Sequence, residues 1–187
     1  AGSDTEMGDR ILYSDSWDVA TAIENMESDG QNPGIVAVIY AQLPEFTPWE
    51  NPEFMGTGKA NDFITSVVED FIPAFESKYN VIQDKTARTI TGADVAGLFA
   101  LYSTLEYPNV FGSCGMFSPS IWYNKADLMS YLAQYTPQHT NTKFALTTAV
   151  QDMAAMQNEC SDVMVQLQQL GYTDMDQLRT AGMHDDK

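Results

Sequence analysis

Asp94 is the residue in this sequence that is best placed to do chemistry. It follows a β-branched run that ends at Thr91 and precedes an apolar segment rich in Ala and Leu, which predicts a strand, a sharp turn and a helix. Gly92 and Ala96 stand two residues before and two after it, as in the small-residue frame of a nucleophile elbow. A carboxylate at such a turn can attack carbon, or it can cap the helix that follows.

Nucleophilic acyl transfer also needs a base that moves a proton and an acid that orients the base. Asp152 comes shortly after a predicted strand that includes Thr147 and Thr148, and it is the best-placed orienting acid in the chain. The sequence has two histidines, His139 and His184. We interpret His139 as a surface loop residue.

Strands and helices alternate in the sequence pattern that positions these residues. The pattern predicts strands at 10–13, 34–40, 86–91, 113–117, 143–149 and 177–181, and helices at 17–27, 61–79, 95–105, 126–133 and 153–170. Pro73 is expected to bend or break its helix. The apolar, β-branched run 34–40 is typical of a buried parallel strand, whereas the proline-rich residues 42–58 predict a long surface loop.

This alternation predicts an α/β fold with a mainly parallel sheet. The chain has 187 residues, of which 44% are hydrophobic, and this is enough to build one well-buried core. We therefore expect a flexible N-terminal segment over residues 1–9 and a single domain over residues 10–187.

The chain carries a formal net charge of -17, from 26 acidic and 9 basic residues. Such a surface repels phosphate backbones and anionic headgroups, so the sequence predicts neither nucleic-acid binding nor membrane-surface binding. The acids indicate a solvated shell that suits a salty or extracellular setting, or else calcium capture. They are scattered and form no calcium-loop motif, so we expect neither a metal ion nor another cofactor.

No apolar run in the sequence is long enough to cross a bilayer, so membrane insertion is not expected. The two cysteines also have a predicted environment. Cys114 falls in a predicted buried strand and Cys160 on the apolar stripe of a predicted helix. Two buried thiols are therefore favoured over a disulfide.

Three segments carry a family resemblance. Residues 90–98 read Ile-Thr-Gly-Ala-Asp-Val-Ala-Gly-Leu, residues 107–112 read Tyr-Pro-Asn-Val-Phe-Gly, and residues 117–120 read Phe-Ser-Pro-Ser. The series resembles the esterase D-like branch of the α/β-hydrolases, which includes enterochelin and feruloyl esterases, S-formylglutathione hydrolases and mycolyltransferases. The resemblance spans most of the chain from Arg10 onward. It implies a three-layer α/β-hydrolase-like fold that is truncated at both ends relative to the family.

The resemblance also implies roles for single residues. The position of the family's nucleophilic serine is Asp94, and the position of its general base is His184. Together with Asp152 they would form a set similar to that of dehalogenases and epoxide hydrolases, in which an aspartate attacks carbon and histidine activates water. The oxyanion site would involve Val95 and the turn around Asp15, where Ser-Asp-Ser replaces the family's Asp-Gly-Gln-like turn.

The family layout further places an aromatic group around the mouth of the site. Its members are Trp49, Phe54, Trp122 and Tyr123. These rings either cover the sheet edge and core or form a pocket for a small-molecule ligand or a partner protein. The implied truncation leaves a sheet edge exposed, so a protein partner or a homo-oligomer is expected to cover it.

Two functional hypotheses follow. In the first, the protein is a degenerate esterase-like subunit with a binding or structural role, because a carboxylate is a poor nucleophile toward ordinary carboxylic esters. In the second, it is an active hydrolase of ester, haloalkane or epoxide type that uses Asp94 as nucleophile and His184 as base. Asp94 is the residue on which the two hypotheses differ.

Overall fold

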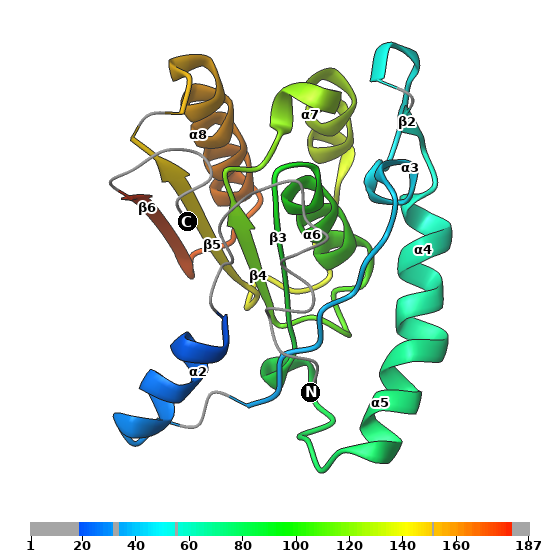
Figure 1. Cartoon of the computed structure of the whole chain (residues 1–187). Coiled ribbons are helices and arrows are strands. Elements are labelled where there is room, and N and C mark those ends of the chain that lie inside the picture. The colour runs from blue at the N-terminus through cyan, green and yellow to red at the C-terminus, as the bar shows by residue number, and fades with distance from the viewer. Residues whose placement is uncertain (1–18, 32–33, 55, 151, 181–187) are drawn as a thin grey trace.

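A four-stranded parallel sheet forms the centre of the molecule (Figure 1). The computed structural model describes residues 19–31, 34–54, 56–150 and 152–180. The strands lie in the order of the chain: β3 (Thr89–Ala93), β4 (Ser113–Phe117), β5 (Lys143–Ala149) and β6 (Met175–Thr180). All three neighbouring pairs are parallel, which confirms the predicted α/β class and parallel sheet.

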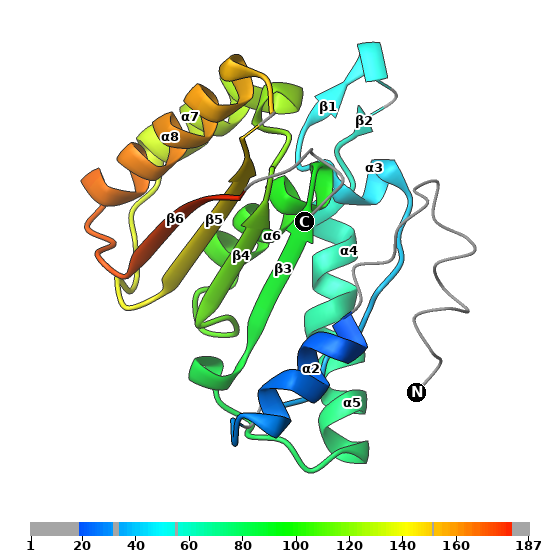
Figure 2. The ribbon, with the colours of Figure 1, turned by 60° about the vertical axis from the view of Figure 1, so that its left-hand side comes forward.

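Three helices connect these strands and cover one face of the sheet. They are α6 (Val95–Glu106), α7 (Lys125–Gln134) and α8 (Ala154–Gln169), and Figure 2 shows α7 and α8 side by side. The core lies between these helices and the sheet, because alternate residues of β4 and β5 face them. Phe144 and Leu146 of β5 are buried there, as are Cys114 of β4 and Cys160 of α8. The prediction of two buried thiols is confirmed.

The N-terminal elements flank the β3 side of the sheet. A short helix α3 (Leu43–Phe46) leads to a hairpin of β1 (Glu50–Asn51) and β2 (Gly56–Thr57), joined through the 3-10 turn η1 (Pro52–Phe54). Residues 42–58 therefore contain short regular elements rather than only the predicted loop. Next come α4 (Ala60–Ser66), the π-helical turn η2 (Val67–Phe71) and α5 (Ile72–Lys78).

These three helical segments continue one another, as predicted for residues 61–79. The π-helical turn ends at Phe71, two residues before Pro73, whose nitrogen has no hydrogen to give to the carbonyl four residues earlier. The predicted disturbance at Pro73 is confirmed. Ile64 and Val67 of this unit pack with Phe99 of α6 in a second apolar cluster, and so the unit is fixed against the helix that follows Asp94.

The predicted strand at residues 34–40 is wrong. The segment pairs with no strand among the described residues, and Ile35, Val36, Val38 and Tyr40 are each more than half exposed. The apolar, β-branched run shows only that these residues favour an extended backbone. A strand also needs a hydrogen-bonding neighbour, which depends on the tertiary arrangement. The helix α2 (Val19–Ser28) before it forms as predicted and is almost wholly exposed.

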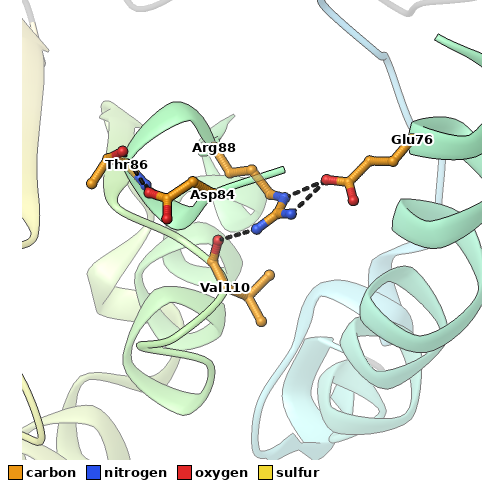
Figure 3. Close-up of polar contacts among 5 residues, drawn as sticks. All are labelled: Glu76, Asp84, Thr86, Arg88 and Val110. Atoms are coloured by element: carbon orange, nitrogen blue, oxygen red, sulfur yellow. Dashed lines mark hydrogen bonds and ion pairs between the residues drawn. The ribbon is translucent and has the colours of Figure 1, made fainter. Parts of the chain in front are cut away.

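Strand β3 starts three residues later than predicted, because Lys85–Ala87 forms a 3-10 turn. Asp84 caps this turn by accepting hydrogen bonds from the backbone N–H and the hydroxyl of Thr86 at 2.9 and 2.6 Å (Figure 3). Arg88 then donates to Glu76 through Nε at 2.7 Å and pairs with it through Nη2 at 2.6 Å. This ion pair fixes the end of α5 to the start of β3.

The predicted segments at 1–9 and 10–13 lie outside the described residues, as does the start of the predicted helix 17–27. Apart from the strand at 34–40, the other predicted elements are present, with ends shifted by a few residues at most. Within the described ranges, none of the helices has the length and apolarity that a bilayer crossing requires.

Candidate functional site

The turn between β3 and α6 is built around Asp94. Its backbone has φ 57° and ψ -127°, a combination that residues with a side chain rarely adopt and that costs about 1–3 kcal/mol. Its N–H donates to the carbonyl of Phe117 at 3.1 Å, and its carbonyl accepts from Gly97 N–H at 3.0 Å. Asp94 is therefore held in a strained, sharply turned conformation at the carboxyl end of the sheet.

Gly92 makes this turn sterically feasible. A Cβ atom at Gly92 would lie 2.2 Å from the carbonyl oxygen of Ala96, so no other residue fits there without movement of the backbone. Gly97 makes a less severe close approach, because a Cβ on Gly97 would lie 3.0 Å from Pro119 Cβ. The first turn of α6 is thus pressed against both β3 and the loop after β4.

The Asp94 carboxylate accepts a hydrogen bond from the hydroxyl of Ser120. It makes no hydrogen bond to the N-terminal amides of α6, so the predicted capping through its side chain is wrong. A capping side chain needs an extended backbone at that residue, and Asp94 has positive φ instead. Val95, which begins α6, is buried beneath the turn.

Asp152 lies just beyond β5 and is buried, with 7% of its surface exposed. One of its carboxylate oxygens, Oδ2, accepts from the Ser118 hydroxyl at 2.5 Å and from the Ala149 N–H at 2.6 Å. A carboxylate with so little access to water needs such donors, because they replace the hydration it has lost. Asp152 is therefore a fixed acceptor at the carboxyl end of the sheet.

The loop Ser118–Ser120 links the two acids. It follows β4, which lies between β3 and β5, so one serine reaches the acid on each side. Ser118 has a φ of 36°, a second positive value at this end of the sheet. The sequence pattern predicts no role for either serine. The available signal was a pair of serines around Pro119, directly after a strand of a parallel sheet.

Two predicted members of the site, His184 and Asp15, lie outside the described residues, so their predicted roles stay predictions. Gly92, Val95 and Asp94 are brought together at the turn. Asp152 is on the same edge of the sheet, two strands away, and is connected to the turn through the serine loop. The described residues include no cluster of three or more His, Cys, Asp or Glu side chains that could hold a metal ion.

The predicted aromatic pocket residues divide into two places. Trp49 packs against Tyr102 of α6 and Tyr131 of α7, with ring centroids 5.7 Å apart in each case. Trp122 and Tyr123 instead belong to the 3-10 turn η4 (Ile121–Asn124) and line a surface hollow beside the β1–β2 hairpin. Neither Asp94 nor Asp152 lines this hollow.

Comparison with known proteins places these features in a family. Residues 14–177 match the family described as "Putative esterase". Uncharacterized protein YbbA of Bacillus subtilis (strain 168) is 29% identical over 101 residues, which cover 51% of this chain and 40% of that protein. Ferri-bacillibactin esterase BesA of the same strain is 35% identical over 85 residues, which cover 46% of this chain and 28% of that protein. The matched regions span less than half of either relative.

Solved structures share the fold. The BES protein from Bacillus cereus matches with a TM-score of 0.60 and 22% identity, over 86% of this chain and 67% of that chain. An enterobactin esterase from Shigella flexneri matches with a TM-score of 0.60 and 19% identity, over 67% of this chain and 33% of that chain. The α/β-hydrolase fold and the esterase resemblance are confirmed. This chain belongs to the esterase family that its residues 14–177 match.

Proposed function

We propose that this protein is an esterase-scaffold protein that lacks ordinary serine-esterase activity and acts by binding. The observation that carries the proposal is the occupant of the turn. The family resemblance puts a nucleophilic serine at this position, and the chain has Asp94. A carboxylate that attacked an ester would form an anhydride, which is more reactive than the ester itself, so the step is unfavourable.

The surroundings of Asp94 support the same proposal. Its carboxylate accepts the Ser120 hydroxyl, and a lone pair that accepts a hydrogen bond is less available to attack carbon. Two other features of the described scaffold are formed, because Gly92 lies close to Ala96 and the Ser118 hydroxyl donates to Asp152. A retained turn and buried acid without the nucleophilic serine are expected of a protein that keeps the esterase fold and no longer catalyses acyl transfer.

The decisive experiment compares three purified proteins on p-nitrophenyl esters: the natural chain, Asp94→Asn and Asp94→Ser. We expect the natural chain to release p-nitrophenol no faster than Asp94→Asn, and Asp94→Ser to exceed both. Asp94→Asn is the matched control, because it removes the charge and keeps the size of the side chain. Hydrolysis by the natural chain that Asp94→Asn abolishes would overturn the proposal.

One observation favours a second candidate, an active hydrolase with Asp94 as nucleophile. Strained backbone of the kind seen at Asp94 is concentrated at functional sites. In this mechanism an Asp94 carboxylate oxygen attacks the substrate carbon and forms an ester, while the halide leaves or the epoxide C–O bond opens. His184 takes a proton from the water that attacks the Asp94 carboxyl carbon, and the alcohol leaves with the original Asp94 oxygen. One solvent oxygen then enters the Asp94 carboxylate in every cycle. Mass spectrometry after turnover of haloalkanes or epoxides in heavy-oxygen water tests this, and an unlabelled Asp94 after turnover contradicts it.

The binding role extends to a protein partner at the edge of the sheet. Among the described residues, β3 pairs with β4 alone, so its other edge has no strand neighbour. Such an edge offers unpaired backbone groups to another chain. Light scattering of the purified protein, alone and at rising concentration, tests whether a second copy is that partner.

A further inference from the structure

The outer edge of β3 can accept a further strand. Among the described residues β3 pairs with β4 alone, and α6 packs on one face of the sheet rather than along this edge. Thr89 and Thr91 of β3 are exposed. The strand contains neither a charged residue nor a proline, and these are the residues with which proteins commonly protect an edge from another chain.

Residues 34–40 have the sequence of such a strand. They read Gly-Ile-Val-Ala-Val-Ile-Tyr and lead to α3 on the β3 side of the sheet (Figures 1 and 2). Ile35, Val36 and Val38 are each 51% exposed, so residues on both alternating faces of the segment remain accessible to solvent. An apolar run on both faces is typical of a strand inside a parallel sheet. The described part of the chain does not give this segment the burial that its sequence favours.

The charges that precede the two surfaces are complementary in one orientation. Residues 19–31, before the segment, carry three acids and no base. Residues 76–88, before β3, carry three bases and two acids, which makes them a net positive stretch in a chain of net charge -17. A parallel alignment brings the acidic stretch to the positive one, whereas an antiparallel alignment brings it toward Asp94. The charges therefore favour a parallel pair.

The carboxyl end of the segment is fixed in its own chain. The helix α3 that follows it accepts a hydrogen bond at the Pro44 carbonyl from the Lys59 N–H, at 3.2 Å. Its Phe46 ring packs edge-on against Phe99 of α6, with centroids 5.5 Å apart. A second copy can bring its exposed segment to the β3 edge without undoing these contacts. Because segment and edge lie on the same side of each molecule, both copies can give and accept a strand in one closed pair.

We propose that two copies of this chain associate by exchange of these segments, so that residues 34–40 of each copy add as a parallel strand to the β3 edge of the other. Main-chain hydrogen bonds hold an added strand, and its alternate side chains select the partner. Neither residues 34–44 nor β3 carries a charge, so the contact itself brings no like charges together. Because this pairing makes a second copy the partner, it deepens the proposed binding role and rests on it.

The first test is light scattering of the natural chain, Val38→Glu and Val165→Glu at matched, rising concentrations. The natural chain should reach twice the mass of one chain. Val38→Glu places a carboxylate in the new strand pair and should raise the dissociation constant of the dimer at least about tenfold. Val165→Glu makes the same substitution on α8, at a residue 49% exposed against 51% for Val38, and should leave the dimer unchanged.

A cross-linking test identifies the two surfaces. Cys114 and Cys160 are buried, so a cysteine introduced at an exposed position is the thiol that a short bismaleimide reaches first. A mixture of Val38→Cys chains with Thr91→Cys chains should give a cross-linked pair in which peptide mapping joins position 38 to position 91. A mixture of Val38→Cys chains with Gln168→Cys chains should not, because Gln168 is exposed on α8 instead.

Three results would overturn the proposal. The first is a natural chain that keeps the mass of one chain at every concentration. The second is a Val165→Glu variant that dissociates as fully as Val38→Glu does. The third is a chain with both Val38→Cys and Thr91→Cys that cross-links within itself, because its own segment then occupies the edge. Circular dichroism checks that each variant is folded, and cross-linking gives the result if Val38→Glu is not.

None of these measurements uses ester hydrolysis. Hydrolysis by the natural chain that Asp94→Asn abolishes therefore counts against the proposed function alone, whereas the absence of a dimer counts against the strand exchange alone.

Discussion

Ser120 binds Asp94 at two points. Its hydroxyl donates to the Asp94 carboxylate, and its backbone N–H donates to the Asp94 carbonyl oxygen at 3.0 Å. Two residues earlier in the same loop, the Ser118 hydroxyl is bonded to Asp152. The loop after β4 therefore fixes Asp94 on one side and Asp152 on the other. Substitutions at these two acids should have coupled effects on stability, because the same loop binds both.

The strained backbone at Asp94 predicts that glycine at this position gives a more stable protein than alanine does. Asp94→Gly and Asp94→Ala both remove the carboxylate, so both lose the Ser120 hydroxyl bond equally. Glycine adopts φ 57° and ψ -127° more easily than alanine does. We therefore expect Asp94→Gly to be more stable than Asp94→Ala by about 1 kcal/mol in urea unfolding.

A control for this comparison is Ala74→Gly in the exposed part of α5. At an ordinary helical position glycine should lower stability by about 1 kcal/mol relative to alanine. If Asp94→Ala is as stable as Asp94→Gly, or more stable, the backbone at position 94 is not strained.

Gly92 predicts a large steric effect. In Gly92→Ala the new Cβ would lie 2.2 Å from the Ala96 carbonyl oxygen, which belongs to the helix backbone and cannot move without shifting α6. We expect a loss of about 3–5 kcal/mol in the free energy of unfolding. Gly115→Ala is the matched control, because its Cβ would meet a side-chain atom, Thr91 Oγ1, at 2.5 Å. Equal losses in the two variants would contradict the special role of Gly92.

The Ser118–Asp152 contact predicts energetic coupling. Ser118→Ala removes one donor from a buried carboxylate, and Asp152→Ala removes the acceptor, so each should cost about 1–3 kcal/mol. The double variant should cost less than the sum of the two by about 1 kcal/mol, because the second substitution has no bond left to break. Chemical unfolding of the four proteins completes the cycle, and strict additivity would show that the bond contributes nothing.

Much of the sheet is predictable from local pattern. The strands at residues 113–117 and 143–149 have the predicted boundaries, since short apolar runs bounded by turn residues mark buried strands. The run at 34–40 carries the same local signal and is not a strand, because no neighbour in the described part of the chain pairs with it. Pairing depends on the arrangement of distant segments, which periodicity does not report.

The candidate site shows the same division. The elbow at Asp94 is predictable because its small neighbours are adjacent in sequence. The bond from Ser120 is not, because it joins residues that are 26 positions apart. Trp49 and Trp122 are alike in the sequence, yet the first packs on Tyr102 and Tyr131 while the second lines the hollow. Which way a ring faces is decided by tertiary packing.

The tyrosines around α6 and α7 predict a loss of stability in alkali. Burial raises the pKa of Tyr102 to about 12, with a further contribution from Glu106. Burial also raises the pKa of Tyr131, whose hydroxyl donates to Glu106 at 2.6 Å. The unfolded chain releases these protons near the ordinary pKa of 10.0, while the folded protein keeps them. Unfolding is therefore favoured as pH rises from about 10 toward 12.

The measurement is the ultraviolet absorbance of phenolate, followed against pH in the folded protein and in urea. The folded protein should show a group of tyrosines that ionise at higher pH than in the unfolded chain, and its urea midpoint should fall across the same range. Tyr102→Phe should make that fall shallower, because phenylalanine has no proton to release in either state. If folded and unfolded protein give the same titration curve, burial does not hold these phenols in their neutral form.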